Sequence, residues 1–254
     1  MTSLLAWHGT RADGTTRHLK IKEVVGVKTF LVGNVELCSN ALHGSIRAVD
    51  MLQYSEGLWI KRTLHEGVVL HDTNKIGSSE RTVIGEADAT QVVVNWAFWC
   101  ADRAVRIHAV AALRQAGMNI EAEKLVGLEA IADKKSALAA SNAGNAIRAA
   151  AFNAGNAIRA AAFNAGNAIR AAAFYSADAV RAAAFYAAYD AVRAAADAAA
   201  DAAGHAANTA AAYDAANTAA AYDAANAVEM EFLNAELERR LLALMGLTET
   251  EVIQ

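Results

Sequence analysis

The chain of 254 residues contains no proline and only two cysteines, Cys38 and Cys100. Proline kinks or ends a helix, so its absence allows long unbroken helices. Two cysteines are too few for a disulfide scaffold or a cysteine-based zinc site. No run of 18 or more bulky apolar residues occurs, which argues against a transmembrane helix. The first residues lack a charged start and an extended apolar core, so we expect no secretory signal.

The chain also has no excess of positive charge: its formal net charge is −4 and its pI is about 6.0. This balance argues against nucleic acid as a general partner. No phosphate-binding loop or dinucleotide fingerprint is present, so no cofactor is predicted. His65, His71, Asp72 and His108 do not have the spacing of a metal-binding motif. We therefore predict no metal, no cofactor, no nucleic acid and no membrane among the partners.

Alanine divides the chain, because 5 of its 65 alanines lie in residues 1–87 and 60 lie in residues 88–254. The first part is rich in Val, Ile, Leu, Thr and Gly, which is typical of short strands separated by turns. The strands that we predict are Leu4–His8, His18–Val24, Lys28–Val32, Val35–Cys38, Leu58–Leu64, Gly67–Leu70 and Arg81–Gly85, with one short helix at Ser45–Gln53. The predicted fold class is α+β, with a small mixed N-terminal head followed by a long alanine-rich, all-helical C-terminal region.

Four segments follow from this pattern: an α+β head at 1–90, connecting helices at 91–135, alanine-rich repeat helices at 136–226, and a C-terminal amphipathic helix at 227–254. Asp88 or Thr90 can cap a helix that begins near Gln91 and ends near Gly117. A second connecting helix is predicted over Ile120–Ala132, from its apolar spacing.

The repeat region starts with NAGNAIRAAAF, which begins at residues 142, 153 and 164 and has a period of 11. Eleven residues are close to three helical turns, so equivalent positions stay nearly aligned along a helix. From Asn208 the repeated unit becomes NTAAAYDAA, with a period of nine. A single alanine-rich helix buries too little surface to be stable alone. We therefore expect a homo-oligomer that associates through these helices, although duplicated, tolerated spacers stay an alternative.

Arginine recurs with the same period in the repeats, at Arg148, Arg159, Arg170 and Arg181. Residues 142–177 contain three of these arginines and no acid, whereas residues 194–238 contain acids and no Lys or Arg. Two interpretations stay open. The arginines bind an anion where symmetric copies bring them together, or they pair with the acids of residues 194–238.

Residues 36–100 contain three blocks with a specific pattern: ELCSNALHGSIRAVDMLQY at 36–54, GVVLHDTNKIGSSERTVIGEADAT at 67–90, and NWAFWCA at 95–101. This stretch resembles a domain family of unknown function, family 7666, which is found mostly in bacteriophage and prophage proteins. The matching residues are Cys38, Leu42, His43, Ser45, Ala48, Asp50, Tyr54, Asp72, Lys75, Glu80, Arg81 and Thr82. The chain departs from the family pattern at Ala41, Gly44 and Ser78–Ser79. The resemblance implies a phage-type origin and no particular activity.

A candidate pocket in the head comprises His8, His43, Tyr54, Glu80 and Arg81. His8-Gly9-Thr10 ends the first predicted strand, as in the first motif of ADP-ribosyltransferases, and the order of the other residues suits such an enzyme. In that chemistry His and Tyr hold the nucleotide and Glu orients a ribose hydroxyl. The alternative is that His43 is hydrogen-bonded inside the domain and that Glu80 and Arg81 are structural.

Taken together, these patterns favour a phage-type, non-catalytic binding and oligomerising protein of the host-cell cytoplasm. Its expected partner is a host protein or a small anionic ligand that it sequesters, as an anti-defence protein would. Two alternatives stay open: an ADP-ribosyltransferase-like enzyme that uses the head, and a structural spacer or virion-associated component.

Overall fold

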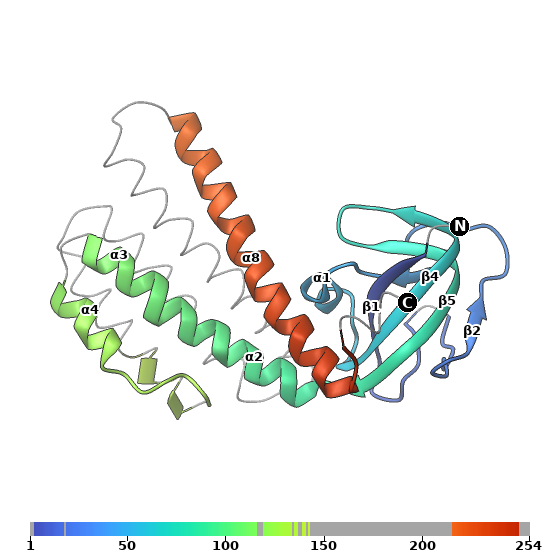
Figure 1. Cartoon of the computed structure of the whole chain (residues 1–254), viewed down its shortest axis with the longest axis horizontal. Helices are drawn as coiled ribbons and strands as arrows, with labels where there is room; N and C mark the ends of the chain where they lie inside the picture. Colours follow the sequence, from blue (N-terminus) through green and yellow to red (C-terminus); the bar gives the residue numbers. More distant parts are fainter. Residues whose placement is uncertain are drawn as a thin grey trace. The chain divides into compact units, whose positions relative to one another are not determined.

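The computed structural model describes residues 3–17, 19–115, 119–133, 135–136, 139–140, 142 and 215–248 (Figure 1). The chain divides into two compact units. The head unit, as we name it here, joins residues up to Val93 with residues from Asn234 onward, and the second unit spans Val94–Leu233. The predicted arginines at 148, 159, 170 and 181 and most of the repeat region lie outside the described residues.

The head unit is built on an antiparallel sheet with the strand order β1-β4-β5-β2 (Figure 1). The strands are β1 (Leu4–Thr10), β2 (Lys28–Phe30), β4 (Trp59–His71) and β5 (Ile76–Asp88), and a short β3 (Leu42–Gly44) also pairs with β5. One short helix, α1 (Ala48–Leu52), follows β3. An antiparallel sheet accompanied by helices is the arrangement expected of the predicted α+β head.

The two faces of this sheet differ in chemistry. Residues of alternating position point to opposite faces, so Trp7 of β1 and Ile60 of β4 share one face. Both are fully buried, together with Val49 and Leu52 of α1. The opposite face carries Lys61, Thr63 and His65, which are also fully buried. This polar face needs partners for every buried group, and the pocket described below lies over it.

The C-terminal part of the last helix, α8 (Ala215–Met245), completes the head unit. Leu237 and Leu241 are fully buried. Glu238 accepts hydrogen bonds from the Trp7 indole Nε1 at 3.0 Å and from the Ala48 amide at 3.1 Å. Asn234 accepts a hydrogen bond from the Val49 amide at 3.1 Å. Because Arg47 provides no side-chain cap, α8 supplies the hydrogen-bond acceptors for the start of α1.

The described part of the second unit is mainly helical. α2 (Thr90–Arg103) continues through a π-helical turn, η1 (Ala104–Ala109), into α3 (Val110–Gln115), and α4 (Asn119–Val126) follows. Asp88 accepts a hydrogen bond from the Thr90 amide at 3.0 Å, in agreement with its predicted capping role. The Trp96 indole donates to the Leu233 carbonyl at 3.1 Å. α2 begins at Thr90, close to the predicted start at Gln91, and α4 ends at Val126 rather than at the expected Ala132.

Two of the predicted strands are wrong. Within His18–Val24 the described residues form only an isolated bridge, and Val35–Cys38 forms a turn. Lys20 and Cys38 have positive φ angles of 52° and 73°, which a continuing strand does not allow. Conversely, the predicted strands Leu58–Leu64 and Gly67–Leu70 fall on a single strand, β4, which begins at Trp59. Gly67, with φ +74°, lies at the irregularity between Glu66 and Val69, so the strand continues past it.

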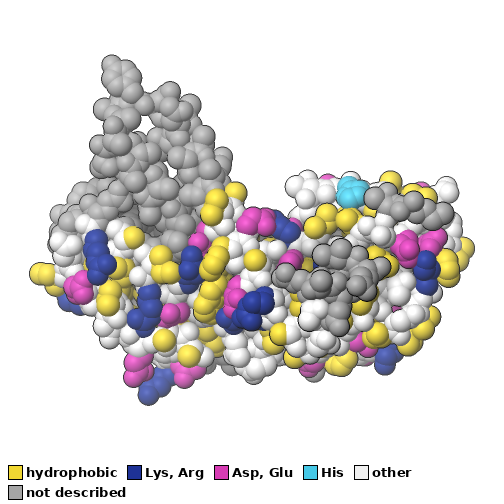
Figure 2. All heavy atoms as spheres, in the orientation of Figure 1, with side chains coloured by type: hydrophobic (Ala, Val, Ile, Leu, Met, Phe, Trp, Pro, Cys, Tyr) yellow, Lys and Arg dark blue, Asp and Glu magenta, His cyan; other side chains and the backbone are white. Residues whose placement is uncertain are grey.

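Charges of both signs are mixed over the surface that Figure 2 shows, where Lys and Arg side chains lie beside Asp and Glu side chains. No helix in the described part of the chain is both long enough and apolar enough to cross a bilayer.

Candidate functional site

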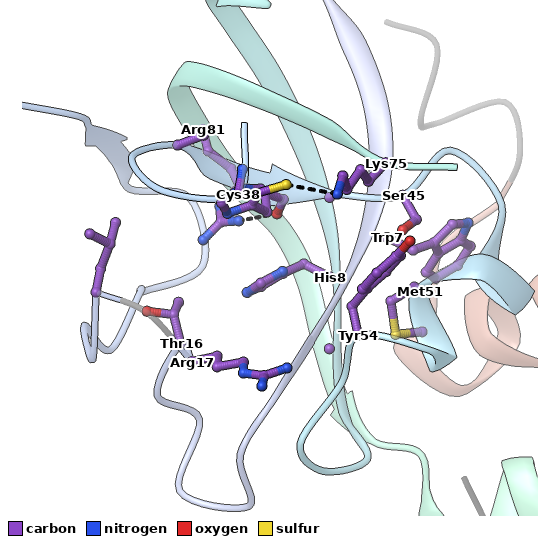
Figure 3. Close-up of a pocket in the computed structure, with 15 residues that line it drawn as sticks. Trp7, His8, Thr16, Arg17, Cys38, Ser45, Met51, Tyr54, Lys75 and Arg81 are labelled. Atoms are coloured by element: carbon purple, nitrogen blue, oxygen red, sulfur yellow. Dashed lines mark hydrogen bonds between the residues drawn. The ribbon is translucent and has the colours of Figure 1, made fainter. Parts of the chain in front are cut away.

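A pocket of about 280 Å³ opens in the head unit, over the polar side of the sheet (Figure 3). Four of the five residues predicted for a pocket line it: His8, His43, Tyr54 and Arg81. They come from β1, from β3, from the turn after α1 and from β5, so the fold brings together residues that are far apart in sequence.

Glu80, the fifth predicted residue, does not line the pocket. Successive residues of a strand point to opposite faces, so Glu80 and its neighbour Arg81 cannot both face the pocket. Glu80 instead pairs with Lys28 on the edge strand β2 at 3.1 Å, and Lys28 also contacts Glu66 at 2.8 Å. Glu80 therefore has the structural role of a surface ion pair.

Arg81 forms part of the pocket floor and is held by a buried ion pair. Its side chain is 1% exposed, and its guanidinium contacts Glu23, which is 0% exposed, at 2.7 Å. The same guanidinium donates to the carbonyl of His43. Lys61, on the neighbouring strand, donates to the backbone carbonyl of Glu23 at 3.3 Å. The floor is thus a buried charged network in which Arg81 already has its partners.

Two histidines share this polar face but differ in their partners. His65 uses both ring nitrogens, with Thr63 at 3.0 Å and Ser78 at 2.8 Å. The buried Nε2 of His8 has no hydrogen-bond partner, and the ring extends into the pocket (Figure 3). Burial, reinforced by the positive charge of Arg81, lowers the pKa of both histidines well below the ordinary value. His8 is therefore a neutral imidazole with an open hydrogen-bonding position.

These lowered pKa values predict a loss of stability in mild acid. The unfolded chain binds protons at His8 and His65 near pH 6.5, whereas the folded chain does not. The free energy of unfolding should therefore fall between pH 7.5 and pH 5.5, by up to about 1.4 kcal/mol per pH unit for each histidine. Urea titrations at both pH values measure this slope. His65→Gln should make the slope shallower, and an unchanged slope would show that His65 does not cause it.

One wall of the pocket is formed by Cys38, His43 and Lys75. The Cys38 amide donates a hydrogen bond to Nε2 of His43 at 3.2 Å, so the His43 ring holds the backbone of this wall. This is the kind of hydrogen bond within the domain that the structural interpretation of His43 predicts. Lys75 donates to the Cys38 sulfur at 2.9 Å and lies 5.7 Å from the centre of the Tyr54 ring. The Tyr54 hydroxyl donates to Asn74 at 2.6 Å, which fixes the ring beside the pocket.

The opposite wall is formed by the segment between β1 and β2. Its pocket-lining residues are Thr16, Arg17 and Leu19. Arg17 lies 3.1 Å from Glu56 and its side chain is 54% exposed. Arg11 contacts the same carboxylate at 2.5 Å. Two guanidinium groups therefore share one carboxylate at this side of the pocket.

Sequence reasoning missed Arg17, Cys38 and Lys75 as pocket residues. The cluster of basic residues between positions 11 and 22 was a usable signal for Arg17. Nothing in the sequence indicated that Cys38 and Lys75 meet, because 37 positions separate them. Within the described ranges, no group of three or more His, Cys, Asp or Glu side chains is placed to hold a metal ion.

No protein-family model, curated protein or solved structure matches this chain. The resemblance of residues 36–100 to family 7666 stays a prediction, and the function of the pocket must be inferred from its own chemistry.

Proposed function

We propose that the head unit binds a small anionic ligand in this pocket and acts by binding rather than by catalysis. One observation carries the proposal: Arg17, Lys75 and His8 line the pocket, Nε2 of His8 is buried without a hydrogen-bond partner, and no described lining residue is a carboxylate. An anion favours such a site because Arg17 and Lys75 attract it, while their carboxylate partners, Glu56 at 3.1 Å and Asp72 at 3.5 Å, do not line the pocket.

The charge balance of the Arg17 wall supports an anion. Residues 11–22 contain four basic residues, Arg11, Arg17, Lys20 and Lys22, and one acid, Asp13. The Asp13 carboxylate accepts hydrogen bonds from the amide and hydroxyl of Thr15. Of these basic residues, Arg11 and Arg17 both contact Glu56, so two positive charges share one carboxylate at this wall. Arg17 is exposed enough to reorient from Glu56 toward a ligand at little cost, because surface ion pairs contribute about 0–1 kcal/mol.

Size and lining limit what else the ligand contains. Pockets for small molecules usually measure about 300–1,000 Å³, so a cavity near 280 Å³ takes a small ligand. The Tyr54 ring, Met51 and Leu19 provide a largely apolar surround. A planar or apolar group with one anionic substituent matches this combination. His8 then forms a hydrogen bond to a polar atom of the same ligand, and its tautomer decides whether it donates or accepts.

The transferase alternative is less well supported. Glu80, its expected carboxylate, lies outside the pocket and pairs with Lys28. Glu23 is the carboxylate nearest the floor, but it is fully buried and pairs with Arg81. A group that orients a ribose hydroxyl must reach the ligand, and neither residue does.

The proposal includes the wider expectations from the sequence. Six of the twelve residues that carry the resemblance line the pocket: Cys38, His43, Ser45, Tyr54, Lys75 and Arg81. This overlap supports ligand binding as the role of the resembling segment. The phage-type origin and sequestration in the host cytoplasm are part of the proposal and come from the resemblance alone. Self-association through the helical repeats of residues 136–226, and anion binding by Arg148, Arg159, Arg170 and Arg181, belong to the same proposal.

A ligand that binds the folded pocket should raise the melting temperature. At a concentration of 100 times Kd the gain is about 2.7 kcal/mol, which corresponds to several degrees for a domain of this size. A thermal-shift panel of nucleoside monophosphates, aromatic carboxylates and inorganic phosphate tests this. Arg17→Gln should raise the Kd of any ligand that responds by at least about tenfold, because the substitution removes a charge-assisted hydrogen bond.

Two further variants make the result specific. Arg114→Gln is the matched control, because Arg114 is 52% exposed and pairs with Glu123 much as Arg17 pairs with Glu56. Its response should equal that of the wild type. Arg159→Gln tests the repeat arginines. If Arg159→Gln alone loses the ligand-induced rise in melting temperature, the ligand binds to the repeats rather than to the pocket. If no compound of the panel raises the melting temperature of the wild type, the proposal is refuted.

A further inference from the structure

Cys38 is an exposed thiol that lines the proposed ligand pocket (Figure 3). The Lys75 ammonium donates a hydrogen bond to its sulfur at 2.9 Å. The same ammonium lies 3.5 Å from the Asp72 carboxylate, so it bridges the sulfur and an acid. A cationic group in contact with an exposed sulfur is a common feature of reactive cysteines. The second cysteine, Cys100, is buried and provides an internal comparison.

The backbone holds Cys38 in one position. Its φ of 73° is rare for a residue other than glycine. A bridge between Glu36 and Asn40 closes the turn, with hydrogen bonds of 2.7 Å and 2.9 Å, and the Cys38 amide donates to His43. Backbone hydrogen bonds thus close the turn that places the sulfur beside Lys75.

His8 is an independent sign that a ligand lies beside this sulfur. Its buried Nε2 has no partner, and a buried polar atom in that state is costly unless something binds it. Figure 3 shows the His8 ring between Cys38 and Arg17. A molecule that contacts His8 therefore lies within reach of both the thiol and the guanidinium.

We propose that Cys38 is a nucleophile that captures small anionic disulfides as a mixed disulfide. The preference for an anion rests on the proposed function, whereas the reactivity of the thiol does not. The Cys38 thiolate attacks one sulfur of the disulfide, a new sulfur–sulfur bond forms, and the old one breaks. The other half leaves as a thiolate and takes the proton that Cys38 lost. Cys38 is oxidised and the departing thiol is reduced, so no other reactant is needed.

Two chromogenic disulfides test both parts on the full chain. Dithiobis(nitrobenzoate) is anionic and dithiodipyridine is neutral. The wild type should release one rapid equivalent from either reagent, and Cys38→Ser should release none rapidly. Lys75→Gln should react about fivefold more slowly with the neutral reagent, because the charge beside the sulfur is lost. The anionic reagent should be slowed further, because Lys75 also attracts the anion. Lys75→Arg keeps the charge and should react within about twofold of the wild type.

Arg17→Gln should slow only the anionic reagent, by about threefold or more, because attraction to the pocket is weaker. Mass spectrometry after incubation with glutathione disulfide should find the adduct on the peptide that contains Cys38. Circular dichroism of each variant checks that the fold is retained.

Several results would overturn the proposal. Equal rates for the wild type and Lys75→Gln would show that the ammonium does not activate the sulfur. Adducts confined to Cys100 would place the reactivity elsewhere. Equal slowing of both reagents by Arg17→Gln, or of neither, would remove the anion preference. Ligand-induced stabilisation of Cys38→Ser reports on the proposed function alone, so the two ideas fail separately.

Discussion

Replacing Glu23 by Gln should lower the free energy of unfolding by about 3–5 kcal/mol, the usual cost of removing one partner of a buried ion pair. Arg81 is 1% exposed and the Glu23 carboxylate that holds it is 0% exposed. Without that carboxylate, the guanidinium charge stays buried and uncompensated. Urea titration followed by circular dichroism measures the loss.

The penalty should come from the charge left behind rather than from the missing contact itself. The double variant Glu23→Gln/Arg81→Met should therefore recover part of the lost stability, because it removes the orphaned charge. Glu123→Gln is the matched control, since its partner Arg114 is exposed, and it should cost less than about 1 kcal/mol. A loss of similar size in Glu123→Gln and Glu23→Gln would contradict the importance of burial.

Glu23 also shows why the pocket could be predicted only in part. The approximate positions of β1, β2, α1, β4 and β5 follow from alternation and turn residues, which are local signals. The order of His8, His43, Tyr54 and Arg81 along those elements was enough to group them. Glu23 lies in a segment predicted as a strand, whereas in the structure it reaches Arg81, 58 positions later. Such a long-range partner leaves no mark in the local pattern.

The polar face of the sheet was equally hidden. Lys61 lies in a strand where an alternating pattern suggests that charged residues face solvent, yet it is fully buried. Its burial depends on the Glu23 backbone carbonyl and on Glu86, whose carboxylate is 3.4 Å away. Gly44 is a further example, because a Cβ there would lie 2.8 Å from Nε2 of His65. The short strand β3 can therefore approach β1 and β4 only with glycine at this position.

The C-terminal helix is the largest element whose role the sequence does not reveal. Residues 227–254 have an amphipathic pattern that predicts a helix but not the surface it covers. In the structure, Asn234 and Glu238 accept the first amide hydrogen bonds of α1. Leu247 lies against β5, since a Cβ on Gly85 would be 2.9 Å from it. The head unit thus requires residues nearly 150 positions beyond its last strand.

Leu241→Ala should consequently destabilise the head unit by about 2–5 kcal/mol, the range measured for truncating a buried leucine. Leu241 is 0% exposed, and its loss leaves a cavity beneath α8. Leu244→Ala is a control of identical chemistry on the same helix, because Leu244 is 42% exposed. It should change the free energy of unfolding by less than about 1 kcal/mol.

Urea unfolding of both variants, followed by circular dichroism and tryptophan fluorescence, gives the comparison. Trp7 donates to Glu238, so the contact between α8 and β1 contributes to the change in emission of the four tryptophans. Leu241→Ala should also weaken ligand binding in the thermal-shift panel. The first amides of α1 donate hydrogen bonds to α8, and α1 carries Met51, which lines the pocket. Equal destabilisation by Leu241→Ala and Leu244→Ala would mean that this part of α8 is not buried against the sheet. In that case the stability of the head unit would not depend on α8.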